Sequence, residues 1–154
     1  MLQREQWVRA LTAHAPQTLK ELAAQLTAQC TVTHTRLPQA GLGLLKIRDG
    51  AFQQAFYLGE FPLATCSVDL KLPDGRCASG GAQVMADDAE LARALAMLDA
   101  ILATKLPGWE TVATHLQSGA KLREEQTRRR RAMLNDTRVD FALLSSAEED
   151  EDEI

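Results

Sequence analysis

The sequence has few cysteines and no long apolar run, and these shortages exclude several classes of protein. Its three cysteines form no CxxC pair, which argues against a zinc knuckle or a dithiol redox site. No apolar stretch approaches the roughly 20 residues that a transmembrane helix needs. Residues 1–5 are polar, and the apolar segment of a signal peptide does not follow them. We therefore expect a cytoplasmic protein with free thiols and no membrane association.

Recognisable catalytic and metal-binding motifs are also missing. The three histidines are His14, His34 and His115. They stand apart in the sequence, without an HxH or HExxH motif. Neither Gly41-Leu42-Gly43 nor Gly80-Gly81 continues as a phosphate-binding loop. Cys66 lies on the inward side of a predicted strand, where burial makes a thiol unreactive. We therefore predict no catalytic residue, no metal site and no bound cofactor.

The overall composition is that of an ordinary globular protein. The chain has 154 residues, about the length of one domain. Apolar residues make up 45% and charged residues 25%, which is typical of globular proteins. The net charge of −4 favours solubility and does not indicate a particular partner.

Apolar periodicity predicts four helices. We expect them over residues 4–15, from Thr18 onward, from Asp87 to a stop at Pro107-Gly108, and from about Thr111 to about Asn135. Pro16 should end the first helix. Thr18 and Glu21 have the spacing of a capping box, in which each side chain bonds a backbone amide at the start of the helix. Asp87 should open the third helix, where a negative charge meets the positive end of the helix dipole.

Between the two pairs of helices the apolar pattern changes to a period of two. The expected strands are residues 31–37, 42–48, 51–58, 63–72 and 76–84. Pro38 should close the first of them, Asp49-Gly50 should form a tight hairpin turn, and Gly59-Glu60 should break the chain again. We therefore predict an α+β fold with two N-terminal helices, a four- or five-stranded mostly antiparallel sheet, two further helices and an acidic disordered tail.

The C-terminal part carries two features that periodicity does not explain. Arg128 to Arg131 is a basic run, which we interpret as a solvated helix face or a protein interface. A nucleic-acid site would need a wider basic surface and stacking aromatics, and aromatic residues are 5% of the chain. Arg138-Val139-Asp140-Phe141 places apolar residues outside the main pattern, and this segment docks either on its own domain or on a partner subunit. We expect one domain over residues 1–146, with a docking segment at 136–146 and an acidic tail at 147–154.

Short motifs along the chain resemble those of a known family, the small G subunit of the bacterial carbon–phosphorus lyase core complex. The matching features, in order, are Trp7, Leu19–Leu22, Gly41-Leu42, Leu58-Gly59-Glu60, Cys66-Ser67-Val68, Ala92, Asp99-Ala100-Ile101-Leu102, Asn135 and Arg138-Val139-Asp140-Phe141. Each motif is short, and their shared order and spacing carry the resemblance. The chain departs from the family pattern at Gln39, at Thr65 and at Asp87, and the last two departures remove an arginine.

The resemblance implies a role in phosphonate catabolism. In this family the G subunit is an accessory part of a complex that couples a phosphonate to the ribose triphosphate of ATP and releases adenine. The implied partners are the other subunits of the complex. We predict Arg138, Val139, Asp140 and Phe141 as partner contacts, with Arg128 and Arg131 beside them.

Two other hypotheses remain open on the sequence. The first is a free-standing anion- or nucleic-acid-binding protein that uses the helix carrying Arg128 to Arg131, for which binding would fall steeply with salt. The second is a small enzyme with an unrecognised site, for which the purified chain alone would turn over a substrate.

Overall fold

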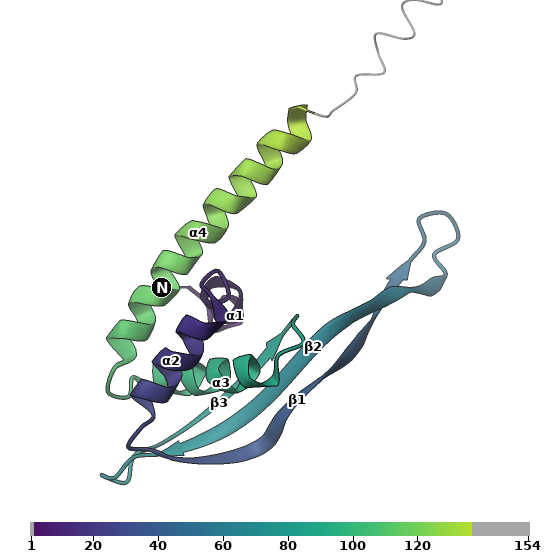
Figure 1. Ribbon diagram of the computed structural model, residues 1–154. Coiled ribbons are helices and arrows are strands. Elements are labelled where there is room, and N and C mark those ends of the chain that lie inside the picture. Colours follow the sequence, from purple (N-terminus) through teal and green to yellow (C-terminus); the bar gives the residue numbers. More distant parts are fainter. Residues whose placement is uncertain (1, 137–154) are drawn as a thin grey trace, which may run out of the picture. The chain divides into compact units, whose positions relative to one another are not determined.

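The computed structural model describes residues 2–136, and it confirms the α+β class (Figure 1). The elements are a 3-10 helix η1 (Arg4–Gln6), α1 (Trp7–Leu11), α2 (Pro16–Leu26), β1 (Thr31–Arg48), β2 (Ala55–Lys71), β3 (Cys77–Val84), α3 (Ala89–Thr104) and α4 (Trp109–Asp136). The chain divides into two compact units, Met1–Lys121 and Leu122–Ile154. All the elements before α4 and the first part of α4 belong to the first unit.

The described residues form three long antiparallel strands in the order β1-β2-β3, so the predicted four or five shorter strands are wrong. Pro38 does not close β1, because it lies in the register shift between Arg36 and Gln39 of an edge strand, where a proline costs no regular ladder bond. The pairing instead shifts register on both sides of Arg36. Gly59 does not break β2 either, since it stays in the ladder opposite Leu45.

The turn between β1 and β2 is longer than the predicted two-residue turn at Asp49-Gly50. β1 ends at Arg48 and β2 begins at Ala55, so residues 49–54 form the connection. The amide of Asp49 donates to the carbonyl oxygen of Gln54 at 3.0 Å and closes the loop. The residue with positive φ is Gln53, at 56°, and not Gly50.

The helix boundaries correct two predicted caps. α2 begins at Pro16, because proline suits the first turn of a helix, where its missing N–H has no intrahelical partner. Thr18 is therefore inside the helix, and the predicted capping box with Glu21 does not open it. α3 is capped by Asp88 and not by Asp87, with the Asp88 carboxylate accepting from the amide of Leu91 at 2.9 Å.

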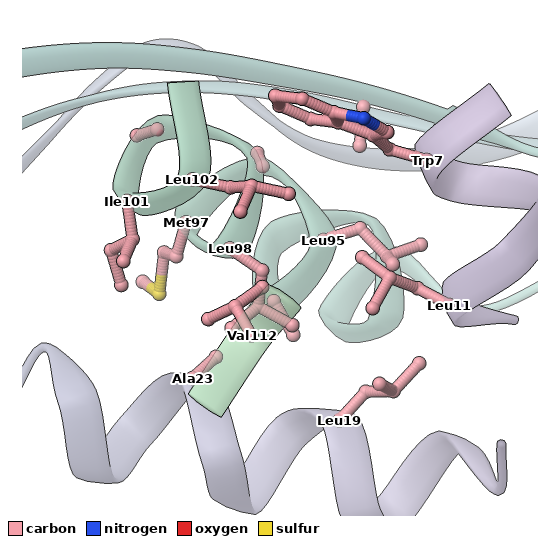
Figure 2. Close-up of a cluster of buried hydrophobic side chains, with 14 of the residues drawn as sticks. Trp7, Leu11, Leu19, Ala23, Leu95, Met97, Leu98, Ile101, Leu102 and Val112 are labelled. Atoms are coloured by element: carbon pink, nitrogen blue, oxygen red, sulfur yellow. The ribbon is translucent and has the colours of Figure 1, made fainter. Parts of the chain in front are cut away.

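The hydrophobic core lies between the sheet and the helices, and α3 is at its centre. Alternate residues of β2 and β3 face α3, and these are Ala64, Cys66, Val68, Leu70, Ala78, Ala82 and Val84, all buried. On the opposite side, Leu19 and Ala23 of α2 point toward Leu95 and Leu98 of α3 (Figure 2). Gly80 allows β3 to approach α3 closely, since a Cβ at Gly80 would lie 2.2 Å from the carbonyl oxygen of Ala96.

A buried carboxylate joins three elements of the first unit. Asp99 of α3 is 6% exposed and accepts from both Nε and Nη2 of Arg4, at 2.9 and 2.6 Å. It also accepts from the backbone amide of Gly81 in β3 at 3.0 Å. The hydrogen bond from Arg4 to Asp99 is the main cause that raises the pKa of Arg4. These bonds offset the cost of burying the charge, so Asp99 holds the N-terminal segment and β3 against α3.

Candidate interaction surface

The β1–β2 hairpin extends beyond the third strand and the core. β3 pairs with β2 only from Ala64 to Lys71. From the Gly41–Leu63 pair onward, β1 and β2 pair only with each other (Figure 1). We call residues 41–63 the arm. A two-stranded ribbon of this kind is only marginally stable by itself in water. Contacts with another surface would therefore stabilise it.

Large apolar side chains of the arm are exposed. They are Leu42 (68% exposed), Leu44 (58%), Leu45 (45%), Phe52 (81%), Phe56 (41%), Tyr57 (61%) and Leu58 (61%). Monomeric proteins rarely leave a continuous apolar surface of this kind in water, and such surfaces mark interaction sites. The arm therefore has the character of an interface that the isolated chain leaves open.

Both faces of the arm carry exposed apolar side chains, and the core-facing side also carries Glu60, Lys46 and Arg48. Side chains of a strand alternate between the two faces of the sheet. Leu42 and Pro62, which are paired, therefore lie on the same face as the buried residues of β2. The opposite side carries Gly43 and Phe61, and the Phe61 ring lies so close over Gly43 that a Cβ there would be 2.6 Å from Cζ. In the part of β2 that β3 covers, this opposite side is polar, as at Ser67. The polar side thus becomes apolar where the arm begins.

The tip of the arm is ordered by one carboxylate. Asp49 accepts hydrogen bonds from the backbone amides of Ala51 at 2.9 Å, Phe52 at 2.5 Å and Gln54 at 3.2 Å. These amides, that of Phe52 foremost, lower the pKa of Asp49. The loop is therefore held in one conformation while the Phe52 ring remains in solvent.

Sequence reasoning did not identify the arm as a site, although a signal was present. The chain has four phenylalanines, one tyrosine and two tryptophans, seven aromatic residues in all. Four of them are Phe52, Phe56, Tyr57 and Phe61. Aromatic residues are enriched at protein interfaces, so this concentration in an aromatic-poor chain points to the arm.

The interface residues predicted from the sequence lie elsewhere. Arg128 and Arg131 are on the last part of α4, in the second unit, and both are exposed. Near them, Arg129 forms an ion pair with Glu125 one helical turn earlier. Arg138, Val139, Asp140 and Phe141 are outside the described residues. Their role as partner contacts stays a prediction.

The histidines and Cys66 have structural contacts in the first unit. His14 donates from Nε2 to the carbonyl oxygen of His115 at 2.8 Å, which joins the loop after α1 to α4. His34 accepts from Nε of Arg93 at 3.2 Å. Burial raises the pKa of the Cys66 thiol, as the sequence predicted for a core position. Within residues 2–136, no three His, Cys, Asp or Glu side chains are grouped as a metal site would require.

Within residues 2–136, no helix is both long enough and apolar enough to cross a bilayer.

The comparisons with known proteins agree with the resemblance found in the sequence. A model of the family described as "Phosphonate metabolism protein PhnG" matches residues 2–145. No curated protein matches the chain. The matched region contains the whole arm and every described helix and strand.

Proposed function

Since the chain belongs to the PhnG family of phosphonate metabolism proteins, we propose that it is an accessory, non-catalytic subunit of a phosphonate-degrading complex. The complex would couple a phosphonate to the ribose triphosphate of ATP and release adenine. In this assembly the chain would bind the other subunits and hold the catalytic one in its active shape. The family membership supports phosphonate metabolism and does not favour a free-standing anion- or nucleic-acid-binding protein.

The arm is the observation that carries the accessory role. Its apolar side chains are exposed on both faces, and in the described part of the first unit no third strand pairs with it. Its length is comparable with the roughly 20–30 residues that each partner contributes to a stable protein interface. A partner that covers the arm would complete its packing. Arg128, Arg131 and the segment Arg138-Val139-Asp140-Phe141 would supply further contacts.

Co-purification tests this proposal directly. The tagged chain is expressed in its native host with a phosphonate as the sole phosphorus source, and the eluted proteins are identified. We expect larger subunits in a fixed ratio, and we expect turnover of ATP and phosphonate only in the presence of those subunits. A chain that elutes alone, or that turns over ATP and phosphonate when pure, would contradict the accessory role.

A further inference from the structure

We propose that the tip of the arm inserts into an apolar pocket of a partner subunit, with Phe52 as the buried anchor and with carboxylates of the partner around Lys46 and Arg48. This inference rests on the proposed function and adds the mode of binding and the chemistry of the receiving surface. In this binding mode, Phe52 is at the centre of the interface, and the faces of the arm contact the partner around it.

Phe52 has the properties of an interface anchor. It is the most exposed large apolar side chain of the described residues, at 81%. Its backbone is already fixed, because the Asp49 carboxylate bonds the amide of Phe52 and those of two neighbours. Binding to a loop that is ordered in advance costs little conformational entropy, and a buried aromatic in a pocket is a common source of binding energy.

The free edges of the arm argue against binding by strand addition. Proline, bulges and charged side chains are the means by which proteins protect exposed strand edges. β1 carries Pro38 and two register shifts at the base of the arm, and Lys46 and Arg48 near its tip. β2 carries Pro62 and a further register shift opposite Leu45 and Lys46. The faces and the tip have no such protection, so they form the binding surface.

A second copy of the chain is a poor occupant of this surface. Two arms packed against each other would each cover one face and leave the other in water. The apolar pairs lie on both sides, with Leu42 and Pro62 on one and Gly43 and Phe61 on the other. A pocket or cleft with two apolar walls covers both sides at once, and a different subunit can supply it.

The charges near the tip define the rim of that pocket. The Nζ of Lys46 lies 5.9 Å from the centre of the Tyr57 ring. Arg48 is the last residue of β1, so both cations are close to the tip of the arm. Of the acidic residues in the arm, Asp49 is engaged with backbone amides. Glu60 pairs with Leu44 on the same face as Lys46, and among the described residues it forms no ion pair with Lys46 or Arg48. Carboxylates on the partner would therefore pair with Lys46 and Arg48, and their attraction would speed association at low salt.

The test compares Phe52→Ala with Met85→Ala. Met85 is 70% exposed and follows β3 outside the arm, so it is a matched control for the loss of an exposed apolar side chain. Each variant replaces the tagged chain in the native host on a phosphonate, and the affinity for the co-purifying subunits is then measured with the purified components. We expect binding to weaken about 30-fold or more for Phe52→Ala and to stay unchanged for Met85→Ala. Thermal melting of each isolated chain checks the fold.

The possible outcomes separate this inference from the proposed function. If the unaltered chain recovers partner subunits and Phe52→Ala binds them equally well, the tip is not the anchor, and the accessory role stands. If the unaltered chain recovers no other subunit, the proposed function fails, and this inference fails with it. If the isolated chain dimerises and Phe52→Ala abolishes the dimer, the occupant is a second copy and the inference is overturned.

Discussion

The two halves of the β1–β2 hairpin have the same backbone pairing and opposite environments. In the covered half, β3 and α3 bury Cys66, Val68 and Leu70, and the other side of β2 is polar. In the arm, both sides carry exposed apolar side chains, and neither a strand nor a helix of the first unit covers them. The covered half is therefore stabilised by packing within the chain. The arm has apolar side chains like those of a core, but no second layer of the first unit packs against them.

The largest expected contrast is between buried and exposed leucines. Leu98→Ala removes a fully buried side chain at the centre of the core and should lower the free energy of unfolding by about 2–5 kcal/mol. Leu44→Ala on the arm removes a side chain that is 58% exposed and should change that free energy by less than about 0.5 kcal/mol. Urea unfolding followed by circular dichroism measures both. Equal losses would show that the isolated arm is packed as tightly as the core.

Two glycines provide a second matched pair. In Gly80→Ala the new Cβ meets backbone atoms of α3, 2.2 Å from the Ala96 oxygen and 2.5 Å from the Ala100 nitrogen, and we expect a loss of about 3 kcal/mol. In Gly59→Ala on the arm the Cβ has no atom within 4 Å, so stability should be unchanged within about 0.5 kcal/mol. Thermal and urea denaturation of the two variants check this. A stable Gly80→Ala variant would mean that α3 can move away from the sheet.

Two aspartates bond backbone amides, one in each region. Asp88 caps α3 and pairs with Lys20 at 2.8 Å, so Asp88→Ala should cost about 1 kcal/mol of global stability. Asp49→Ala should leave the midpoint of unfolding unchanged, since Asp49 orders only the tip. Amide hydrogen exchange should then become faster only at the tip, at Ala51, Phe52 and Gln54. A global loss for Asp49→Ala would indicate that the arm and the core unfold together.

The smallest effect is the pH dependence of the same two groups. The hydrogen bond from Lys20, and then that from the Leu91 amide, lower the pKa of Asp88, and backbone amides lower the pKa of Asp49. A carboxylate with a lowered pKa in the folded state stabilises it fully above the ordinary Asp pKa of about 3.9 and loses this contribution as pH falls through the lowered value. Acidification below about pH 4 should therefore reduce global stability through Asp88 and should loosen only the tip through Asp49. Denaturation and NMR at several pH values distinguish the two.

The sequence predicted most of the covered half and little of the arm. The alternation over residues 63–72 correctly predicted which side of β2 is buried, and the stop of α3 before Pro107-Gly108 was also correct. The expectation that proline and glycine end strands failed at Pro38 and Gly59. Whether either residue destabilises a strand depends on how that strand is paired with its neighbour, which the local sequence does not show. The predicted turn at Asp49-Gly50 was too short, because the side chain of Asp49 favours a longer, amide-bonded loop.

By itself, the sequence determined the α+β class, the approximate helices, the buried side of β2 and the membership of a phosphonate metabolism family. These depend on short-range periodicity and on the identity of single residues. Only the tertiary structure decided that five apparent strands are three, and that β3 and α3 cover one part of a long hairpin and leave the other bare. An apolar pattern specifies that a face must be covered, but what covers it is set by contacts between residues far apart in the chain. For the arm, those contacts are expected to come from another subunit.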